Sequence, residues 1–119
     1  MKLNLYTVES NGTLLDAAKA IAKNRSRCVV VMNSKKLVGV ISEGDLIRAL
    51  LLDTDIHSKM DPFIQHGIFF LYERNMVKAL EIFRTHGISL IPIVNSELGL
   101  EDVITIQDIL SQVSLLEKE

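Results

Sequence analysis

The chain has 119 residues, a net charge of −2 and a hydrophobic fraction of 48%, which is enough apolar material for one compact core. Its aromatic fraction of 5% and its slightly acidic balance argue against a nucleic-acid partner. The single cysteine, Cys28, excludes a disulfide scaffold and a cysteine-based zinc site. No stretch reads as a signal peptide or approaches the ~20 apolar residues of a membrane helix, so we expect a cytoplasmic protein without a membrane partner.

The first half of the chain predicts a helix, two strands and a second helix. Apolar residues recur at helical spacing over 14–22, after Thr13 as N-cap and with Asp16 as its capping-box partner. The apolar run 28–32 predicts a buried strand, and 37–41 predicts a second strand after a turn. A short helix with apolar periodicity follows.

The second half repeats this order. Asn75 is the expected N-cap of a helix that Gly87 ends. Strands are expected at 90–94 and 100–104, followed by a last helix. Pro92 cannot donate a backbone hydrogen bond, which favours a place at a sheet edge or a strand start.

The two halves keep a nearly constant register, since Thr13 and Asn75 are 62 positions apart and Asp45 and Asp108 are 63 apart. One unit of about 50 residues buries too little surface alone, so we expect two units packed sheet to sheet. The predicted fold class is α/β (α+β), with helix–strand–strand–helix repeats at 1–52 and 68–119. The polar, turn-rich segment 53–67 is the predicted linker.

Both units carry a hydroxyl residue three positions before an aspartate where the second strand passes into the second helix. The pairs are Ser42 with Asp45 and Thr105 with Asp108. One interpretation is purely structural, because this spacing is typical of a helix N-cap. The other is functional: a helix N-terminus and a hydroxyl suit a phosphate, and a carboxylate accepts from a ribose diol. The same residues can do both.

The repeat order and the string Gly39-Val40-Ile41-Ser42-Glu43-Gly44-Asp45 resemble the cystathionine-β-synthase (CBS) domain, and Ile91-Pro92-Ile93-Val94 is similar to that family's Pro-Val strand. The resemblance implies a pseudo-two-fold pair of repeats with two clefts between them. It also implies a ligand such as AMP, ADP, ATP or S-adenosylmethionine, no prosthetic group, and a homodimer.

The resemblance implies roles for particular residues. Asp45 and Asp108 are expected to hold ribose, and the hydroxyls of Ser42 and Thr105 to meet phosphate. The apolar side chains of Val40, Phe69 and Ile104 are expected to contact adenine. Arg27 and Ser89, which precede the first strand of each repeat, are expected to border the ligand. The family's glycine is present as Gly39 but is replaced by Asp102 in the second copy, which favours the first cleft.

Arg48 lies one helical turn after Asp45, on the same face. It would either neutralise a nucleotide phosphate or pair with Asp45 or Glu43 at the surface. The segment from Ser42 to Leu51 is further similar to CBS pairs fused to sugar-phosphate nucleotidyltransferases.

The expected function is therefore an adenine-nucleotide sensor that controls an attached or partner enzyme, such as a sugar nucleotidyltransferase. The alternative is a ligand-free dimerisation module. An enzyme in its own right is not expected, because the sequence shows no catalytic residues and no Gly-rich phosphate loop. No metal site is expected either, since His57, His66 and His86 are not spaced as ligands.

Overall fold

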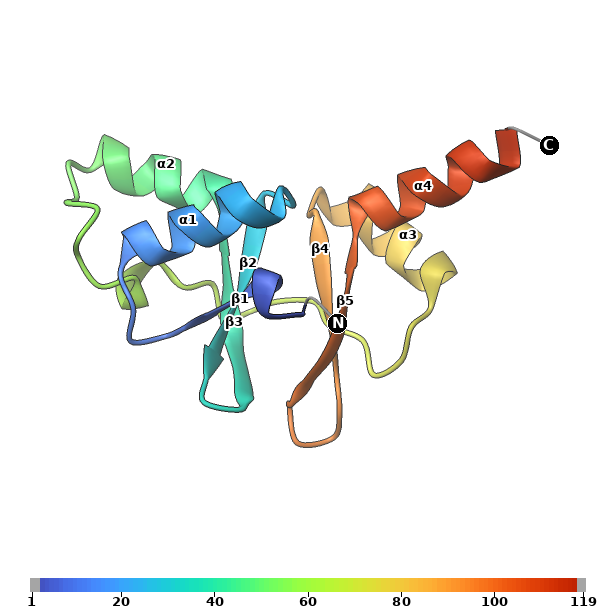
Figure 1. Cartoon of the computed structure of the whole chain (residues 1–119), viewed down its shortest axis with the longest axis horizontal. Helices are drawn as coiled ribbons and strands as arrows, with labels where there is room; N and C mark the ends of the chain where they lie inside the picture. The colour runs from blue at the N-terminus through green and yellow to red at the C-terminus, as the bar shows by residue number, and fades with distance from the viewer. Residues whose placement is uncertain (1–2, 118–119) are drawn as a thin grey trace.

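The computed structural model describes the backbone of residues 3–117 and the side chains of residues 3–112. Two α/β units lie side by side, and each presents its strands toward the other and its helices toward the outside (Figure 1). The molecule is elongated along the line that joins the units, with principal extents of 49 × 31 × 26 Å. This arrangement confirms the predicted fold class of two packed helix–strand–strand–helix repeats.

The first repeat contains a three-stranded sheet in the order β1-β2-β3. Its elements are η1 (Leu3–Tyr6), β1 (Thr7–Glu9), α1 (Leu14–Asn24), β2 (Cys28–Asn33), β3 (Lys36–Ser42) and α2 (Glu43–Leu51). Strand β1 runs parallel to β2, and β2 runs antiparallel to β3. Strand β1 is thus a short extended lead-in to the first helix, and it adds a third strand to the two that the sequence predicted.

The second repeat contains a two-stranded sheet, β4-β5. Its elements are α3 (Met76–His86), β4 (Leu90–Val94), β5 (Leu100–Thr105) and α4 (Ile106–Glu117). Here the lead-in over residues 68–70 forms no strand, and only Leu71 makes an isolated bridge, to Ile93.

Pro92 explains why this lead-in stays unpaired. Its carbonyl oxygen accepts a hydrogen bond from the Leu71 N–H at 3.0 Å, so the Pro92 nitrogen faces the same segment. That nitrogen has no hydrogen to donate, so a third strand would lose a ladder bond at this point. The expectation that Pro92 lies at a sheet edge is confirmed.

Helix ends follow the predicted capping residues. The Thr13 N–H donates to Asp16 Oδ2 at 2.9 Å, and the Asp16 N–H donates to Thr13 Oγ1 at 3.2 Å, which completes the capping box of α1. Asn75 Oδ1 accepts from the Lys78 N–H at 3.0 Å at the start of α3. Gly87 ends α3 with a φ of 63°, a left-handed conformation that glycine adopts without strain.

Strand β2 contributes side chains to two hydrophobic cores, because successive side chains point to opposite faces of the sheet. Val29 and Val31 pack under α1 and α2, while Cys28, Val30 and Met32 pack against the second repeat. There they meet Leu90 of β4 and Val103 of β5. A third cluster fills the second repeat beneath α3 and α4. The repeats therefore share a core between their sheets, as expected.

The segment predicted as a polar linker packs against the first repeat. It contains the short helix η2 (Asp61–Phe63). Met60, just before η2, is completely buried, and Ile64, just after it, is nearly so; both belong to the core under α1 and α2. The next residue, Gln65, exchanges two backbone hydrogen bonds of 2.9 and 3.0 Å with Val40 of β3.

Gly39 allows this close approach of the connector to β3. A Cβ at position 39 would lie 2.2 Å from the carbonyl oxygen of Gln65 and 2.7 Å from a side-chain carbon of Ile64. Any residue other than glycine would push the connector away from the strand. The glycine in the motif is thus explained by the path of the chain.

Candidate functional site

A cleft of about 460 Å³ lies between the two repeats. It brings together five of the expected ligand-binding residues from both halves of the chain: Arg27, Val40, Ser42, Phe69 and Ser89. Its remaining walls are formed by the start of α2, the connector and the end of α3. A volume of this size suits a small organic ligand.

Ser42 is positioned by the passage from β3 into α2. It is the N-cap of α2, and its Oγ accepts from the Asp45 N–H at 3.2 Å while its own N–H donates to Asp45 Oδ2 at 2.8 Å. The structural interpretation of the motif as a helix cap is therefore correct. Ser42, Glu43 and Gly44 line the cleft, so the N-terminus of α2 faces whatever occupies it. Two N–H groups of this helix end are already bonded, that of Glu43 to the Arg27 carbonyl oxygen and that of Asp45 to Ser42 Oγ.

Asp45 is buried, with an exposed fraction of 5%, and four donor groups contact its carboxylate. They are the Ser42 N–H, the Ser42 hydroxyl, the Arg48 guanidinium and the Gln65 side-chain amide. Burial raises the pKa of Asp45, but these hydrogen bonds outweigh it, and the pKa lies below its ordinary value. Asp45 is therefore ionised at neutral pH.

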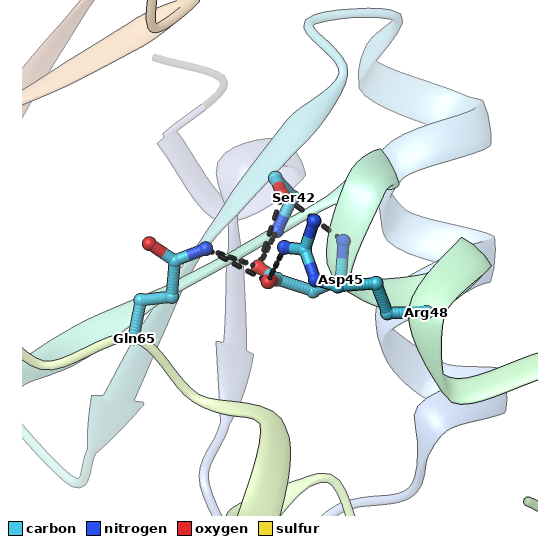
Figure 2. Close-up of polar contacts among 4 residues, drawn as sticks. All are labelled: Ser42, Asp45, Arg48 and Gln65. Atoms are coloured by element: carbon cyan, nitrogen blue, oxygen red, sulfur yellow. Dashed lines mark hydrogen bonds and ion pairs between the residues drawn. The ribbon is translucent and has the colours of Figure 1, made fainter. Parts of the chain in front are cut away.

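Gln65 is a part of this site that the sequence did not predict. Its Nε2 donates to both carboxylate oxygens of Asp45, at 2.7 and 2.9 Å. In Figure 2 the amide reaches the carboxylate from the connector, whereas Ser42 comes from the strand end and Arg48 from the helix. Twenty positions separate Gln65 from Asp45, and no local pattern links residues at that distance.

Arg48 takes the second of the two roles considered for it. Its Nη2 donates to Asp45 Oδ1, and its side chain is otherwise largely exposed. It is not among the residues that line the cleft. In this structure Arg48 therefore stabilises the ionised Asp45 and makes no wall for a ligand.

The rim of the cleft carries a loose ion pair. Arg27 Nε lies 3.9 Å from Glu43 Oε2, and both side chains are well exposed. Deeper in, the Ser89 hydroxyl donates to the Ser26 carbonyl oxygen at 2.7 Å, which joins the two repeats. Arg27 is the cationic group best placed to meet an anion in the cleft, and Ser89 forms part of the wall with its hydroxyl already bonded.

Phe69 forms an aromatic stack with His86 in the wall of the cleft. Their ring centroids are 4.1 Å apart and their planes differ by 29°. Phe69 is 40% exposed, so part of its ring is open to a ligand. Val40 lines the same cleft from β3, which makes an apolar surface for a planar base. Phe69 and Val40 were predicted here from the sequence, whereas His86 was considered there only as a metal ligand.

The second motif is built as a cap but is not part of this cleft. The Thr105 N–H donates to Asp108 Oδ2 at 2.8 Å, and the Asp108 N–H donates to Thr105 Oγ1 at 3.3 Å. Ile104, expected against an adenine, is fully buried in the core of the second repeat, because it packs beneath α3 and α4. None of these three residues lines the cleft between the repeats.

Arg74, which the sequence did not single out, pairs with two aspartates beside the second motif. Its Nη1 lies 2.9 Å from Asp102 Oδ2, and its Nη2 lies 3.6 Å from Asp108 Oδ2. Asp102, whose presence in place of glycine favoured the first cleft, has its negative charge paired with Arg74. An ion-pair network therefore lies beside the second motif.

Cys28 lines the cleft from a buried position in β2. Burial, with a smaller contribution from the charge of Asp45, raises the pKa of its thiol to about 12. The thiol is therefore protonated at neutral pH, and Cys28 acts as a core residue rather than as a nucleophile.

Among the residues that the structure describes, no three His, Cys, Asp or Glu side chains gather in an arrangement that could hold a metal ion. Within the same residues, no helix has the length and apolar character needed to cross a bilayer.

Comparison with known proteins identifies the repeats. The model of the CBS domain family matches residues 1–52 and 68–115. An uncharacterised 17.7 kDa protein of Acidianus ambivalens is 29% identical over 107 residues, which cover 88% of this chain and 65% of that protein. A homoserine O-acetyltransferase of Methanosarcina acetivorans is 26% identical over 92% of this chain but only 20% of its own length. The chain thus spans less than two thirds of these curated relatives.

Solved structures agree with the sequence comparison. The CBS domain protein PAE2072 from Pyrobaculum aerophilum, complexed with AMP, superimposes with a TM-score of 0.80 at 27% identity, over 98% of this chain and 95% of that one. Protein MJ1225 from Methanocaldococcus jannaschii, described as an archaeal homologue of γ-AMPK, gives a TM-score of 0.78 at 25% identity, over 94% of this chain and 46% of that one. With both repeats matched by the family model, the chain belongs to the CBS domain family, and its two halves form a CBS domain pair.

Proposed function

We propose that this CBS pair is a regulatory module that binds an adenine nucleotide, with AMP as the first candidate, in the cleft between its repeats. One observation carries the proposal: the cleft joins the N-terminus of α2, capped by Ser42, to the open face of Phe69 from the other repeat. A phosphate needs donors and a base needs a flat apolar surface, and the cleft offers both.

Each part of a nucleotide has a complementary group in the site. The positive end of the α2 dipole and the Arg27 guanidinium suit a phosphate. The carboxylate of Asp45 suits the two hydroxyls of a ribose, because it is ionised and accepts hydrogen bonds. The surfaces of Val40 and Phe69 suit adenine. The AMP complex of PAE2072, a protein with the same fold and 27% identity, supports this assignment.

A ligand in this cleft would act on the arrangement of the repeats, because its contacts come from both of them. It shifts the equilibrium between two arrangements only by its difference in affinity for them. We propose that this shift controls an attached or partner enzyme in the cytoplasm. A nucleotidyltransferase was expected from the sequence, and the acetyltransferase relatives make an acyltransferase a second candidate. We also propose that residues 1–52 form the first repeat, 53–67 the linker and 68–119 the second repeat.

A homodimer is proposed as the assembled form, and a ligand-free dimerisation module remains the second candidate function. The observation that favours assembly is a set of exposed apolar side chains on the helices: Ile47, Leu50 and Leu51 of α2, Leu52 after it, and Val77 and Leu80 of α3. Clusters of this kind are typical of protein contacts. Light scattering over a concentration series would show a dimer mass, and a constant monomer mass would contradict the dimer.

Calorimetric titration tests the binding function. AMP, ADP, ATP and S-adenosylmethionine are titrated into the wild-type chain, the variant Asp45→Ala and the matched control Asp108→Ala. We expect Asp45→Ala to weaken the binding of AMP at least about tenfold, because it removes a charged acceptor. Asp108→Ala should change the affinity little, since neither Asp108 nor its partners Thr105 and Arg74 line the cleft, whereas Asp45 is bonded to the lining residues Ser42 and Gln65.

The outcomes separate the function from the site. Absence of binding by all four ligands to the wild-type chain would contradict nucleotide sensing and favour the dimerisation module. Binding that Asp45→Ala leaves unchanged would contradict the site assignment alone. Because Asp45 also caps α2, thermal unfolding followed by circular dichroism must show that each variant is folded at the temperature of the titration.

A further inference from the structure

The carboxylate of Asp45 has no acceptor capacity left for a ligand in this structure. A carboxylate offers about four lone-pair sites on its two oxygens. Here Oδ2 accepts from the Ser42 N–H, the Ser42 hydroxyl and Gln65, and Oδ1 accepts from Arg48 and Gln65. A ribose diol can therefore bind Asp45 only after one of these donors has left.

The donors differ in how easily they can leave and in where they lie. The Ser42 N–H is fixed by the capping box of α2, and Arg48 does not line the cleft. Gln65 does line the cleft, and it is the only one of these donors that approaches Asp45 from the connector (Figure 2). The Gln65 amide thus lies between the carboxylate and the space that a ligand would enter.

The Gln65 amide also occupies the position that a diol would take. Its Nε2 lies 2.7 and 2.9 Å from the two oxygens of Asp45, so that one N–H points between them in a three-centre hydrogen bond. A cis-diol, with one hydroxyl for each oxygen, spans the same pair of oxygens. Exchange of the amide for the diol therefore keeps the carboxylate satisfied throughout, which matters for a charge as buried as Asp45.

We propose that Gln65 is a built-in competitor of the ligand, whose amide holds the ribose position on Asp45 until a nucleotide diol displaces it. This inference rests on the proposed function and adds the residue that sets the affinity of the site. Only the side chain needs to move, because two hydrogen bonds to Val40 hold the Gln65 backbone and the glycine at 39 keeps it close to β3.

The test is calorimetric titration of AMP and 2′-deoxy-AMP into the wild-type chain and Gln65→Met, which keeps the length of the side chain but removes the amide. We expect Gln65→Met to bind AMP roughly threefold to tenfold more tightly than the wild type, since no hydrogen bond must be broken first. The gain for 2′-deoxy-AMP should be smaller, because its single hydroxyl needs only one oxygen of Asp45 and can leave the Gln65 amide on the other.

The matched control is His66→Ala, the next residue along the connector. The ring of His66 contacts the Val38 carbonyl oxygen, with Nδ1 at 3.1 Å, and takes no part in the bonding of Asp45. Its removal should leave the affinity for AMP unchanged. A similar gain in both variants would mean that loosening the connector is the cause, and would overturn the role of the Gln65 amide.

The remaining outcomes distinguish this inference from the proposed function. Binding of AMP to Gln65→Met that is equal to or weaker than wild type overturns the competitor role and leaves the function intact. Binding to Gln65→Met alone supports the blocking of Asp45 by the amide but overturns nucleotide sensing by the wild-type chain. Absence of binding to either chain overturns both.

A measurement on the wild-type chain makes the result independent of how well the variant folds. The side-chain amide signals of Gln65, identified in a ¹⁵N–¹H NMR spectrum by their absence from Gln65→Met or by direct assignment, should move when AMP is added to saturation. Signals that stay in place would overturn the proposal.

Discussion

The first repeat has three strands and places Ser42 of its motif in the wall of the cleft, with Asp45 hydrogen-bonded to the lining residues Ser42 and Gln65, whereas the second has two strands and carries its Thr105–Asp108 motif away from the cleft. Both motifs cap the helix that follows, with nearly the same hydrogen bonds. The difference therefore lies in the neighbours of the motif. The same local pattern therefore becomes a candidate ligand site only where other segments build walls beside it.

The connector is the neighbour that matters most in the first repeat. It passes over Gly39, places Gln65 beside Asp45 and continues into Phe69 in the wall of the cleft. At the position equivalent to Gly39, the second repeat has Asp102, and within residues 3–112 the side chain of Asp102 is paired with Arg74. A side chain is tolerated there because it points to an ion-pair partner and not into a crossing backbone.

Replacement of Met60 by alanine should give the largest effect on stability. Met60 belongs to the predicted linker by sequence but is fully buried in the first core, so the change leaves a cavity and should cost about 3 kcal/mol. Met76→Ala, at a half-buried position beside the second core, should cost about 1 kcal/mol. Urea unfolding measures both. Equal costs would show that the connector is not a specific part of the first repeat.

Replacement of Gly39 by alanine should come next, at about 2 kcal/mol, because the new Cβ would collide with the connector backbone. The matched control is Gly44→Ala in α2. Its nearest neighbour would be the Arg48 guanidinium at 3.5 Å, an ordinary contact, so stability should stay the same or rise by up to about 1 kcal/mol. If both variants unfolded at the same urea concentration, the explanation of Gly39 by the path of the connector would be wrong.

Acid unfolding should show the smallest effect, and it tests how the first motif holds its charge. The pKa of Asp45 is lower in the folded than in the unfolded chain, so its ionised form stabilises the fold fully at neutral pH. That contribution is lost as the pH falls through about 4, the unfolded value, toward the lower folded pKa.

The measurement compares thermal unfolding between pH 7 and pH 3 for three chains. Asp45→Asn should be less stable than wild type at pH 7 and should lose less stability on acidification. Gln65→Met should fall between the two, because it removes only one of the donors that lower the pKa of Asp45. Parallel curves for wild type and Asp45→Asn would contradict this account of the buried carboxylate.

Much of the fold could be predicted from the sequence because its signals are local. Helix caps such as Thr13 and Asn75 act over three residues, and the unbroken apolar run of β2 marks a strand that is buried on both faces. Pro92 marks an edge because it lacks an N–H wherever it is placed. Each of these follows from properties that a few neighbouring residues have by themselves.

The candidate site could be predicted only in part, for the same reason. Ser42 and Asp45 form a local pattern, and resemblance to a family added Val40 and Phe69. Gln65, His86 and Arg74 carry no such pattern. Each acquires its role from a partner 17 to 28 positions away in the chain: Asp45 for Gln65, Phe69 for His86 and Asp102 for Arg74.

The sequence by itself thus determined two capped α/β repeats and their order, because helix capping and apolar periodicity are short-range. Only the tertiary structure decided which segments build the walls of the cleft, where the linker packs and what occupies the carboxylate of Asp45. Those outcomes depend on how the connector crosses β3 at Gly39, a close approach of two backbones that no pattern of neighbouring residues specifies.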